Sequence, residues 1–403
     1  MHEKQNTWHV LHIPRWYPHR GDPMPGLFVR NHIESLPAKC ESSVLFLLFV
    51  DKQRKTYDYE AASINNVYTC TAYIRRASVV LPFLSHLINT FRYFRAFFKC
   101  YRSIRKAKGK PVIVHAHVLT RAGLLAYIIN RWHGVPYVIT EHWTRYLPGM
   151  ANYHGFLRKF LTEKVVERAG AVMPVTANLR DAMRNNNLYN QHYVVVPNVV
   201  DVNKFRPASQ IEPRSKKVLV HLSCFTDQQK NISGILRVIS RLKEKRNDFV
   251  LKLIGDGEDF EKMKQLAEEL NVLNSFVIFT GLKQDEALVG LLNQADLMIM
   301  FSNYENLPVV ILESFACGVP VISTRVGGIH EHLNEDMGRL VEPGNEDQFL
   351  EALNDFLDNP GVYSKEKIRK YAVDHFSSQV IGDSYLAVYT DVLLGAGMYK
   401  PWL

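Results

Sequence analysis

Two glutamates and the turn between them are the residues best placed to do chemistry in this sequence. Glu305 and Glu313 lie eight positions apart, and Glu305 comes shortly after an apolar run that is typical of a buried strand. We expect Glu305 at the strand end and Glu313 on the following helix, with Asn306 capping that helix and Pro308 in its first turn. The backbone N–H groups of this turn would then point outward and form an anion site.

A diphosphate is the ligand that such a site predicts. Its charge would meet the positive end of the helix dipole, and charge that develops on it as a leaving group would be stabilised in the same way. Glu313 could accept hydrogen bonds from a ribose diol, so the two carboxylates would contact opposite ends of one nucleotide-diphosphate sugar. The alternative is that Glu313 is a helix-surface residue and Glu305 an exposed turn residue.

A lysine upstream could neutralise the same diphosphate. Lys230 precedes a predicted helix that starts near Ile232, where it would meet the phosphates as a point charge; a solvated lysine is the alternative. The sequence has no Asp-x-Asp motif and no His or Cys cluster at ligand spacing. We therefore expect the lysine and the helix amides to replace a metal ion, and no metal or other cofactor to be required.

Short β-rich runs alternate with helix-like segments along the chain, which is typical of parallel sheets covered by helices. At 403 residues the chain is longer than one core usually supports. We predict an α/β protein of two doubly wound, Rossmann-like domains facing across a cleft, over 1–200 and 201–375, with a helical segment 376–403 packing back toward the first. Gly255-Asp256-Gly257 lacks the third glycine of GxGxxG, which argues against a dinucleotide hydride carrier.

The first domain offers a glycine and a histidine for the ligand. Gly26 lies in a Pro- and Gly-rich loop, where backbone could approach a sugar or phosphate before a helix begins near Phe28; an ordinary surface loop is the alternative. His117 ends the predicted strand VIVHAH and should point into the cleft, although an isolated histidine is usually structural. His142 and Glu141, at the end of the next strand, are weaker candidates.

The stretch ENLPVVILE, followed by SFACGVPVISTRVGG, resembles the signature of the retaining GT-B glycosyltransferases of family four. Further matching pieces are spread along the whole chain: HAH, TEH, VVPNVVDVNKF, LKLIGDG, VIFTGL and GRLVEPGN. The resemblance implies that Glu305 lies by the transferred hexose, that Glu313 binds the donor ribose, and that the amides of Asn306 and Leu307 hold the diphosphate. It also implies that His117 binds and orients the donor sugar rather than acting as a base.

Two further points concern the nucleotide base and the charge of the diphosphate. For the nucleotide base, strand-end position favours Leu282 and Lys283, in the turn after VIFTG. The family also has an arginine about five residues before the lysine, whereas Cys224 or Phe225 stands there in this chain. Either another basic residue, among them Arg15, Arg20 and Arg30, supplies that charge, or transfer is slower than in the family at large.

Charge is unevenly distributed along the chain. Residues 1–200 hold 27 Lys plus Arg against 11 Asp plus Glu, and the remainder holds 22 against 29, so +16 and −7 sum to the net +9. From Ala61 to Thr140 there are twelve Lys or Arg and no Asp or Glu. This asymmetry predicts an anionic partner for one half only.

A predicted helix over 84–106 carries part of this charge. Its apolar stripe consists of Leu84, Leu87, Phe91, Phe94, Phe98 and Tyr101. A cationic ridge follows one residue later, at Arg92, Arg95, Lys99, Arg102 and Lys106. The pattern is typical of a helix attracted to an anionic membrane surface, and equally of a helix docked on its own sheet with solvated cations beside it. No nucleic-acid motif accompanies the charge, so we expect no nucleic-acid partner.

These features predict a retaining, metal-independent hexosyltransferase that takes a UDP- or GDP-sugar and acts on a lipid-linked or polysaccharide acceptor in cell-envelope, capsule or exopolysaccharide assembly. The alternatives are a transferase making a small glycoside and a catalytically silent partner protein. Five scattered cysteines favour reduced core thiols, and no signal peptide or membrane-spanning run is evident. We expect a cytoplasmic protein that is soluble or peripheral on the membrane.

Overall fold

The computed structural model describes residues 7–79, 81–150, 153–209 and 214–397, and these form two compact units. Unit 1 comprises the described parts of 1–175, 180–196 and 381–403. Unit 2 comprises 176–179 and 197–380. Each unit is an α/β fold around a mainly parallel sheet, so the prediction of two Rossmann-like domains is confirmed.

Unit 1 is built on a seven-stranded sheet. Its strands are β1 (Trp8–Pro14), β2 (Cys40–Val50), β3 (Tyr57–Ile64), β4 (Val67–Arg75), β5 (Ile113–His117), β6 (Tyr137–Glu141) and β7 (Ala171–Pro174). The strand order is β3-β4-β2-β1-β5-β6-β7, and in this sheet the antiparallel pair is β3 with β4. The order reverses between β1 and β5, and in such sheets ligands bind outside the carboxyl ends of the strands at that reversal.

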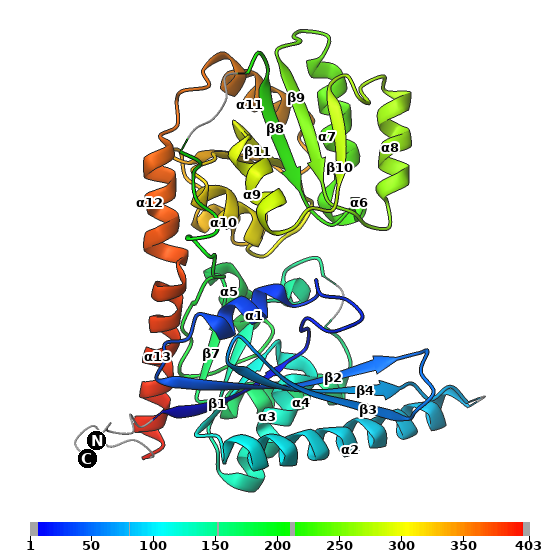
Figure 1. Ribbon diagram of the computed structural model, residues 1–403, viewed down its shortest axis with the longest axis vertical. Coiled ribbons are helices and arrows are strands. Elements are labelled where there is room, and N and C mark those ends of the chain that lie inside the picture. Colours follow the sequence, from blue (N-terminus) through cyan, green and yellow to red (C-terminus); the bar gives the residue numbers. More distant parts are fainter. Residues whose placement is uncertain (1–6, 80, 151–152, 210–213, 398–403) are drawn as a thin grey trace. The chain divides into compact units, whose positions relative to one another are not determined.

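Helices cover both faces of this sheet. They are α1 (Leu27–Glu34), α2 (Pro82–Lys108), α3 (Leu119–His133), α4 (Phe156–Arg168) and α5 (Ala177–Asn185), with a short 3-10 turn, η1 (Thr144–Tyr146). Figure 1 shows α2 and α3 on one side of the sheet and α1 on the other.

The end of the chain supplies one more helix to unit 1. Helix α13 (Ser378–Gly395) buries Tyr385 and Tyr389, whose hydroxyls each lie 2.7 Å from the Nδ1 of a histidine, His32 and His115 respectively. A Cβ at Gly382 would collide with the carbonyl oxygen of Ser35. The glycine therefore permits the close packing that brings the two tyrosines to the histidines.

Unit 2 has a six-stranded sheet in which every neighbouring pair is parallel. Its strands are β8 (Lys217–Leu222), β9 (Phe249–Ile254), β10 (Val277–Gly281), β11 (Leu297–Met300), β12 (Val321–Thr324) and β13 (Gly338–Val341). The order β10-β9-β8-β11-β12-β13 is that of a Rossmann fold, because the first and fourth strands of the unit are neighbours in the middle. The reversal lies between β8 and β11.

The helices of unit 2 are α6 (Asp227–Lys230), α7 (Ile232–Leu242), α8 (Phe260–Glu269), α9 (Asp285–Asn293), α10 (Val309–Ala316), α11 (Glu346–Asp358) and α12 (Lys365–Phe376), with the 3-10 turn η2 (Ile329–Glu331). Its core joins the sheet to α7 and α11, and the ring of Phe301 stacks on that of Phe349 at 4.6 Å between centroids. This stack anchors the chain directly before the site residues that follow β11.

Among the described helices, none combines the length with the apolar run that crossing a bilayer requires.

Candidate functional site

The reversal point of unit 2 brings Lys230 and Glu305 together. Lys230 ends α6, in the connection that follows β8, and Glu305 lies in the turn that follows β11. The Lys230 Nζ lies 2.5 Å from the Glu305 Oε1, and both residues are buried, with 8% and 5% exposed. Glu305 is therefore not an exposed turn residue, and Lys230 is not a solvated lysine.

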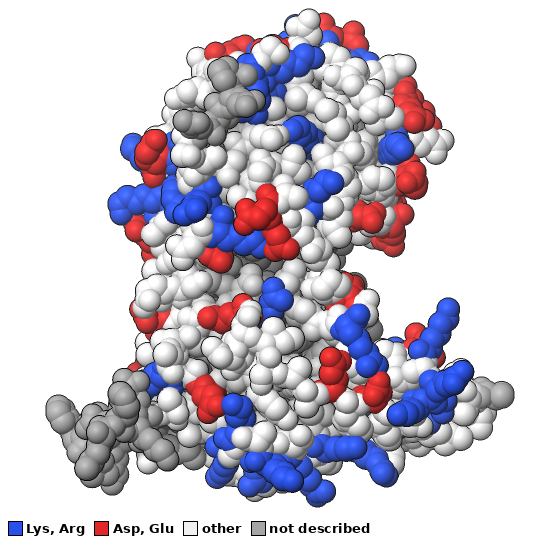
Figure 2. All heavy atoms as spheres, in the orientation of Figure 1, with Lys and Arg blue, Asp and Glu red and all other residues white. Residues whose placement is uncertain are grey.

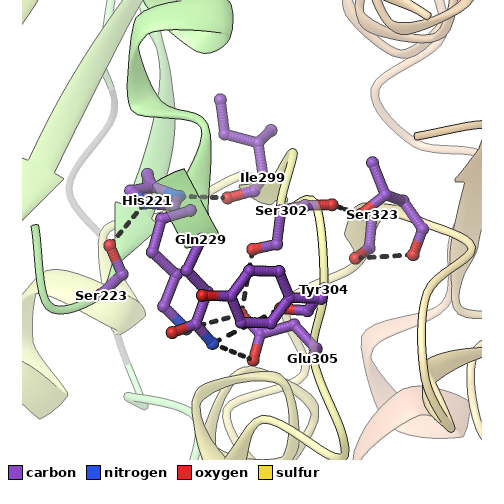
Figure 3. Close-up of polar contacts among 10 residues, drawn as sticks. His221, Ser223, Gln229, Ile299, Ser302, Tyr304, Glu305 and Ser323 are labelled. Carbon is purple, nitrogen blue, oxygen red and sulfur yellow. Dashed lines mark hydrogen bonds and ion pairs between the residues drawn. The ribbon is translucent and has the colours of Figure 1, made fainter. Parts of the chain in front are cut away.

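Neighbouring polar groups hold the Glu305 carboxylate in place. The Ser302 hydroxyl donates to its Oε1 at 3.0 Å, and the Gln229 amide lies 3.4 Å from its Oε2. Figure 3 shows the Ser302 and Gln229 side chains close to Glu305, with His221 at the upper left between Ser223 and Ile299. The His221 Nδ1 donates to the Ile299 carbonyl, and burial lowers its pKa to about 4, so this ring is neutral. A neutral histidine leaves the lysine as the positive charge beside Glu305.

The turn after Glu305 differs from the prediction. Asn306 does not cap α10, because its Oδ1 accepts a hydrogen bond from the Thr176 hydroxyl at 2.9 Å. Pro308 is the N-cap residue itself and not part of the first turn, since its ψ of 124° is extended and the helix begins at Val309. The first N–H groups of a helix have no partner within it, so an anion site at this helix would start two residues later than predicted, with Pro308 and not Asn306 as the N-cap.

Two glycines explain why the turn can be so close-packed. A Cβ on Gly327 would collide with the backbone of Glu305, and one on Gly328 would collide with the Thr176 side chain. The Gly328 N–H donates to the Asn306 carbonyl at 2.9 Å, and the Asn198 amide donates to the Leu307 carbonyl at 2.7 Å. Sequence reasoning gave no role to Thr176, Asn198 or these glycines, although Asn198 and the glycines lie within the motifs that carry the resemblance.

Glu313 lies on α10, one to two turns beyond Glu305. Burial raises the pKa of Glu313 to about 7, and the positive charge of Lys204 opposes this shift. The carboxyl is therefore poised to change charge near neutral pH. Leu282 and Lys283 lie in the loop after β10, where Leu282 is exposed.

Unit 1 gathers five histidines behind the carboxyl end of its sheet: His12, His32, His115, His117 and His142. His117 is fully buried, and burial lowers its pKa well below the ordinary value, so the ring is neutral. Its Nε2 lies 3.2 Å from the His12 Nδ1, while its own Nδ1 is buried and has no hydrogen-bond partner in the part of the chain that the structure describes. That atom is available for a ligand hydroxyl.

The same histidines correct the expectation that no His cluster exists. In the described part of the chain, the nitrogens of His12, His115 and His117, and those of His32, His117 and His142, lie within 4.8 Å of one another. Both nitrogens of His115 are already within 2.7 Å of hydroxyl groups, of Tyr389 and Thr140. Metal binding by the first set would break these hydrogen bonds. Spacing along the sequence could not show the cluster because the histidines come from separate elements.

Glu141 has a structural role. It is fully buried, and its carboxylate accepts backbone N–H bonds from Leu119, His142 and Trp143 at 2.8–2.9 Å. Burial raises its pKa, and the three amides oppose that shift. The bond to Leu119 holds the start of α3 beside Val118, a β-branched residue at φ 71°. Such backbone strain persists where surrounding bonds enforce it.

Gly26 approaches its own chain and not open space. Its φ is 76°, and a Cβ there would collide with the backbone of Trp16 and Tyr17. The glycine thus packs the loop after β1 against the start of α1.

The three arginines considered as substitutes for the missing one differ in their partners. Arg20 forms an ion pair with Asp58 at 2.5 Å, and Arg30 lies 3.7 Å from the Glu34 carboxylate. Arg15 donates to the Thr120 hydroxyl and forms no ion pair among the described residues. Of the three, Arg15 keeps its charge available for an anion.

Helix α2 forms as predicted, but its apolar stripe divides into two parts. The half near Lys108 docks on the sheet through Ala96, Phe97, Cys100, Tyr101 and Ile104. Leu84, Leu87 and Phe91 are exposed, so they do not pack on the sheet. Phe97 belongs to the buried face, and Phe94 and Phe98 are only partly buried.

The cationic ridge of α2 also divides. Arg92 donates to the Arg75 carbonyl, and Arg95 and Lys99 lie over the rings of Tyr57 and Tyr59. Arg102 and Lys106 are exposed. Lys and Arg gather on the surface over the region of α2 (Figure 2).

Comparison with known proteins shows the family of this chain. Residues 203–375 match the family model for glycosyl transferases group 1, and residues 45–199 match that for a glycosyl transferase 4-like domain. The chain is 30% identical to N-acetyl-alpha-D-glucosaminyl L-malate synthase of Bacillus anthracis over 302 residues, which are 70% of this chain and 75% of that protein. The chain belongs to the group 1 glycosyltransferases.

Solved structures show the same fold for this glycosyltransferase. Anabaena HepE in complex with UDP and glucose matches with a TM-score of 0.70 and 16% identity, covering 94% of this chain and 99% of HepE. The lipopolysaccharide outer core galactosyltransferase WaaB matches with a TM-score of 0.67 and 18% identity, covering 95% and 99%. The fold is thus of the GT-B class, as the motifs predicted.

Proposed function

We propose that this glycosyltransferase moves a hexose from a UDP- or GDP-sugar, with retention of configuration and without a metal ion, to a lipid-linked or polysaccharide acceptor of the cell envelope, capsule or exopolysaccharide. The observation that carries the proposal is the buried pair of Lys230 and Glu305 at the reversal point of unit 2, directly before the N-terminus of α10. Paired, buried charges are preorganised electrostatics of the kind that stabilises a transition state.

Each residue then has a role in the donor site. Glu305 lies by the hexose, while Lys230 and the backbone amides of Asn306, Leu307 and the start of α10 stabilise the diphosphate as it leaves. Pro308 sets where the helix starts and so where those amides point. Glu313 accepts the ribose hydroxyls, and Leu282 and Lys283 contact the base.

Unit 1 contributes the acceptor side and a contact to the sugar. The His117 Nδ1, buried without a partner, can accept a hydrogen bond from a sugar hydroxyl in its neutral form. Gly26 holds the loop after β1 in place. Because the leaving phosphate can itself take the acceptor proton, the neutral histidine is assigned to binding and orientation.

The exposed half of α2 supports a peripheral contact with an anionic membrane. Phe83, Leu84, Leu87 and Phe91 are exposed on it, and the exposed cations Arg102 and Lys106 lie on the same helix. A helix that exposes apolar side chains and also carries exposed cations, here on its other half, is compatible with contact to an anionic membrane surface. An acceptor of the cell envelope is supported by the similarity to WaaB, a galactosyltransferase of the lipopolysaccharide outer core.

A thermal-shift screen of UDP-, GDP- and ADP-sugars, with and without EDTA, tests the donor site. We expect one nucleotide sugar to raise the unfolding midpoint equally in both conditions, since binding to the folded state stabilises it. Glu313→Ala should lose the shift, and Glu335→Ala, an exposed glutamate of the same unit, should keep it. No shift with any nucleotide sugar would contradict the donor site, and a shift that EDTA removes would contradict metal independence.

A further inference from the structure

Unit 1 carries a group of buried positive charge that the donor site does not use. Arg15 follows β1, and Arg145 lies in η1, after β6. Their Cζ atoms lie 4.4 and 3.5 Å from the centroid of the Trp143 ring. We propose that Arg15, Trp143 and Arg145 bind an anionic group of the acceptor, a phosphate or a carboxylate. This rests on the proposed glycosyl transfer, and it narrows the acceptor to a phosphorylated or carboxylated molecule.

Arg145 lacks the partners that a buried guanidinium requires. It is 6% exposed, and among the described residues its Nε and Nη1 are buried without a hydrogen bond, as is the Nε of Arg15. Buried N–H donors are nearly always paired in folded proteins, so unpaired ones call for an explanation such as a missing ligand. An anion would accept bonds from both guanidinium groups.

The arginines also repel one another. Burial lowers the pKa of Arg15, and the charge of Arg121 lowers it further. Burial lowers the pKa of Arg145, and the charge of Arg158 adds to that. A bound anion would raise the pKa of both arginines again. Its oxygens would replace the lost water, and its negative charge would offset the repulsion between the positive charges.

Glu141 is a nearby carboxylate whose charge raises the pKa of both arginines, but its hydrogen bonds go to other groups. Its two oxygens accept three backbone N–H bonds, which hold α3 and the turn after β6. The sequence offers no other acidic residue from Ala61 to Thr140. Among the described residues neither arginine forms an ion pair with Glu141, so the oxygens that would accept bonds from the two guanidinium groups can come from a ligand.

The two arginines also lie where a sheet of this kind binds ligands. Arg15 leaves β1 directly beside the end of β5, and its N–H donates to the His117 carbonyl at 3.1 Å. This is the reversal point of the sheet, where doubly wound folds bind ligands. A cavity of about 390 Å³ opens beside Arg145, with Tyr146, Tyr153 and Asn186 among its lining residues. Its size suits the organic part of a small acceptor.

Arginine pairs fit this chemistry better than lysines would. The planar guanidinium matches phosphate and carboxylate oxygens two at a time, and it stacks on aromatic rings. Trp143 contacts both guanidinium groups through its ring. The anionic group could belong to a free metabolite or to a lipid phosphate, and the same arginines would recognise either.

Calorimetric titration of the full chain with inorganic phosphate, succinate and short-chain phosphatidic acid, at fixed ionic strength, tests the proposal. We expect at least one of these anions to bind, and Arg145→Gln and Arg15→Gln each to weaken its binding at least tenfold. Arg20→Gln, which removes an exposed arginine already paired with Asp58, should leave it unchanged. Arg15→Gln keeps the test valid if Arg145→Gln does not fold.

The outcomes separate the sources and the two proposals. Preference for phosphatidic acid over inorganic phosphate supports a lipid-linked acceptor, whereas equal or better binding of phosphate or succinate supports a free one. Unchanged anion affinity in both variants, or no binding of any probe to the wild type, would overturn the proposal. Loss of nucleotide-sugar binding in Arg15→Gln would also overturn it, because Arg15 would then serve the donor. If anions bind at the arginines but no nucleotide sugar binds to the wild type, the donor site fails and the anion site stands.

Discussion

The two units use related sheet topologies around their reversal points but treat charge in opposite ways. In unit 2, Lys230 and Glu305 neutralise each other across 2.5 Å before any ligand arrives. In unit 1, Arg15 and Arg145 both lie over the ring of Trp143. The carboxylate of the neighbouring Glu141 accepts hydrogen bonds from backbone N–H groups and not from the arginines. A paired site is rigid and ready for chemistry, whereas an unpaired one is completed by its ligand. The topology thus sets where a site lies, and the residues decide what it does.

Breaking the charge pair of unit 2 should have the largest effect. Glu305→Gln keeps the side-chain volume but removes the negative charge beside Lys230, so kcat/KM for transfer should fall by about 10²–10³-fold. Steady-state kinetics with the donor found in the screen measures this. Glu335→Gln, on the surface of the same unit, is the matched control. Activity of Glu305→Gln within twofold of the wild type would show that this carboxylate does not take part.

The titration of Glu313 should have an intermediate effect. Its pKa is raised to about 7, and only the ionised carboxylate accepts both ribose hydroxyls. Donor affinity should therefore rise about tenfold between pH 6 and pH 8, as the carboxyl loses its proton. Calorimetry with a nucleotide sugar, whose diphosphate does not titrate in this range, measures the change. A pH dependence that survives in Glu313→Gln would assign it to another group.

The raised pKa of Glu313 also makes the free energy of unfolding depend on pH. A carboxyl whose pKa is higher in the folded than in the unfolded state favours folding while it is protonated. This contribution is present below the unfolded pKa of about 4.3 and is lost as the pH rises to about 7.

The surface of unit 1 should show the smallest effect. Phe83 and Phe91 are 73% and 66% exposed on α2. Replacing both with serine should lower co-sedimentation with phosphatidylglycerol vesicles by several-fold, because apolar burial and charge attraction act together. Ile64→Ser, at an exposed position on β3, is the control. Equal sedimentation of all variants, or no sedimentation of the wild type with the vesicles, would contradict the proposed contact between α2 and the membrane.

The sequence predicted the features that depend on local pattern. Alternation of strands and helices indicated two doubly wound units, and the motifs assigned Lys230 and Glu305 to the same ligand without predicting that the two side chains pair. It could not predict Asn306 correctly, because the capping preference of asparagine was overridden by a hydroxyl donor, Thr176, 130 residues earlier in the chain. Tertiary hydrogen bonds of this kind leave no trace in local spacing.

Unit 1 was harder to predict for the same reason. The histidine cluster and the arginine pair around Trp143 are assembled from the ends of separate strands, so no single stretch of sequence contains them. For helix α2, the periodicity predicts the helix correctly. It does not show which part of the helix packs on the sheet, because the extent of the sheet is set by other segments. The exposed half of α2, with Leu84, Leu87 and Phe91, was visible only once β2 and β4 were in place.

The C-terminal helix has a consequence for how the protein is made. Tyr385 and Tyr389 reach His32 and His115, so residues near the end of the chain complete a core begun more than 270 positions earlier. During synthesis, unit 2 has left the ribosome before unit 1 has all of its parts. N-terminal domains generally fold first during synthesis, but unit 1 cannot complete its core until α13 has been made. A ribosome that stopped before Tyr385 would release a chain with an intact donor site and an unfinished partner.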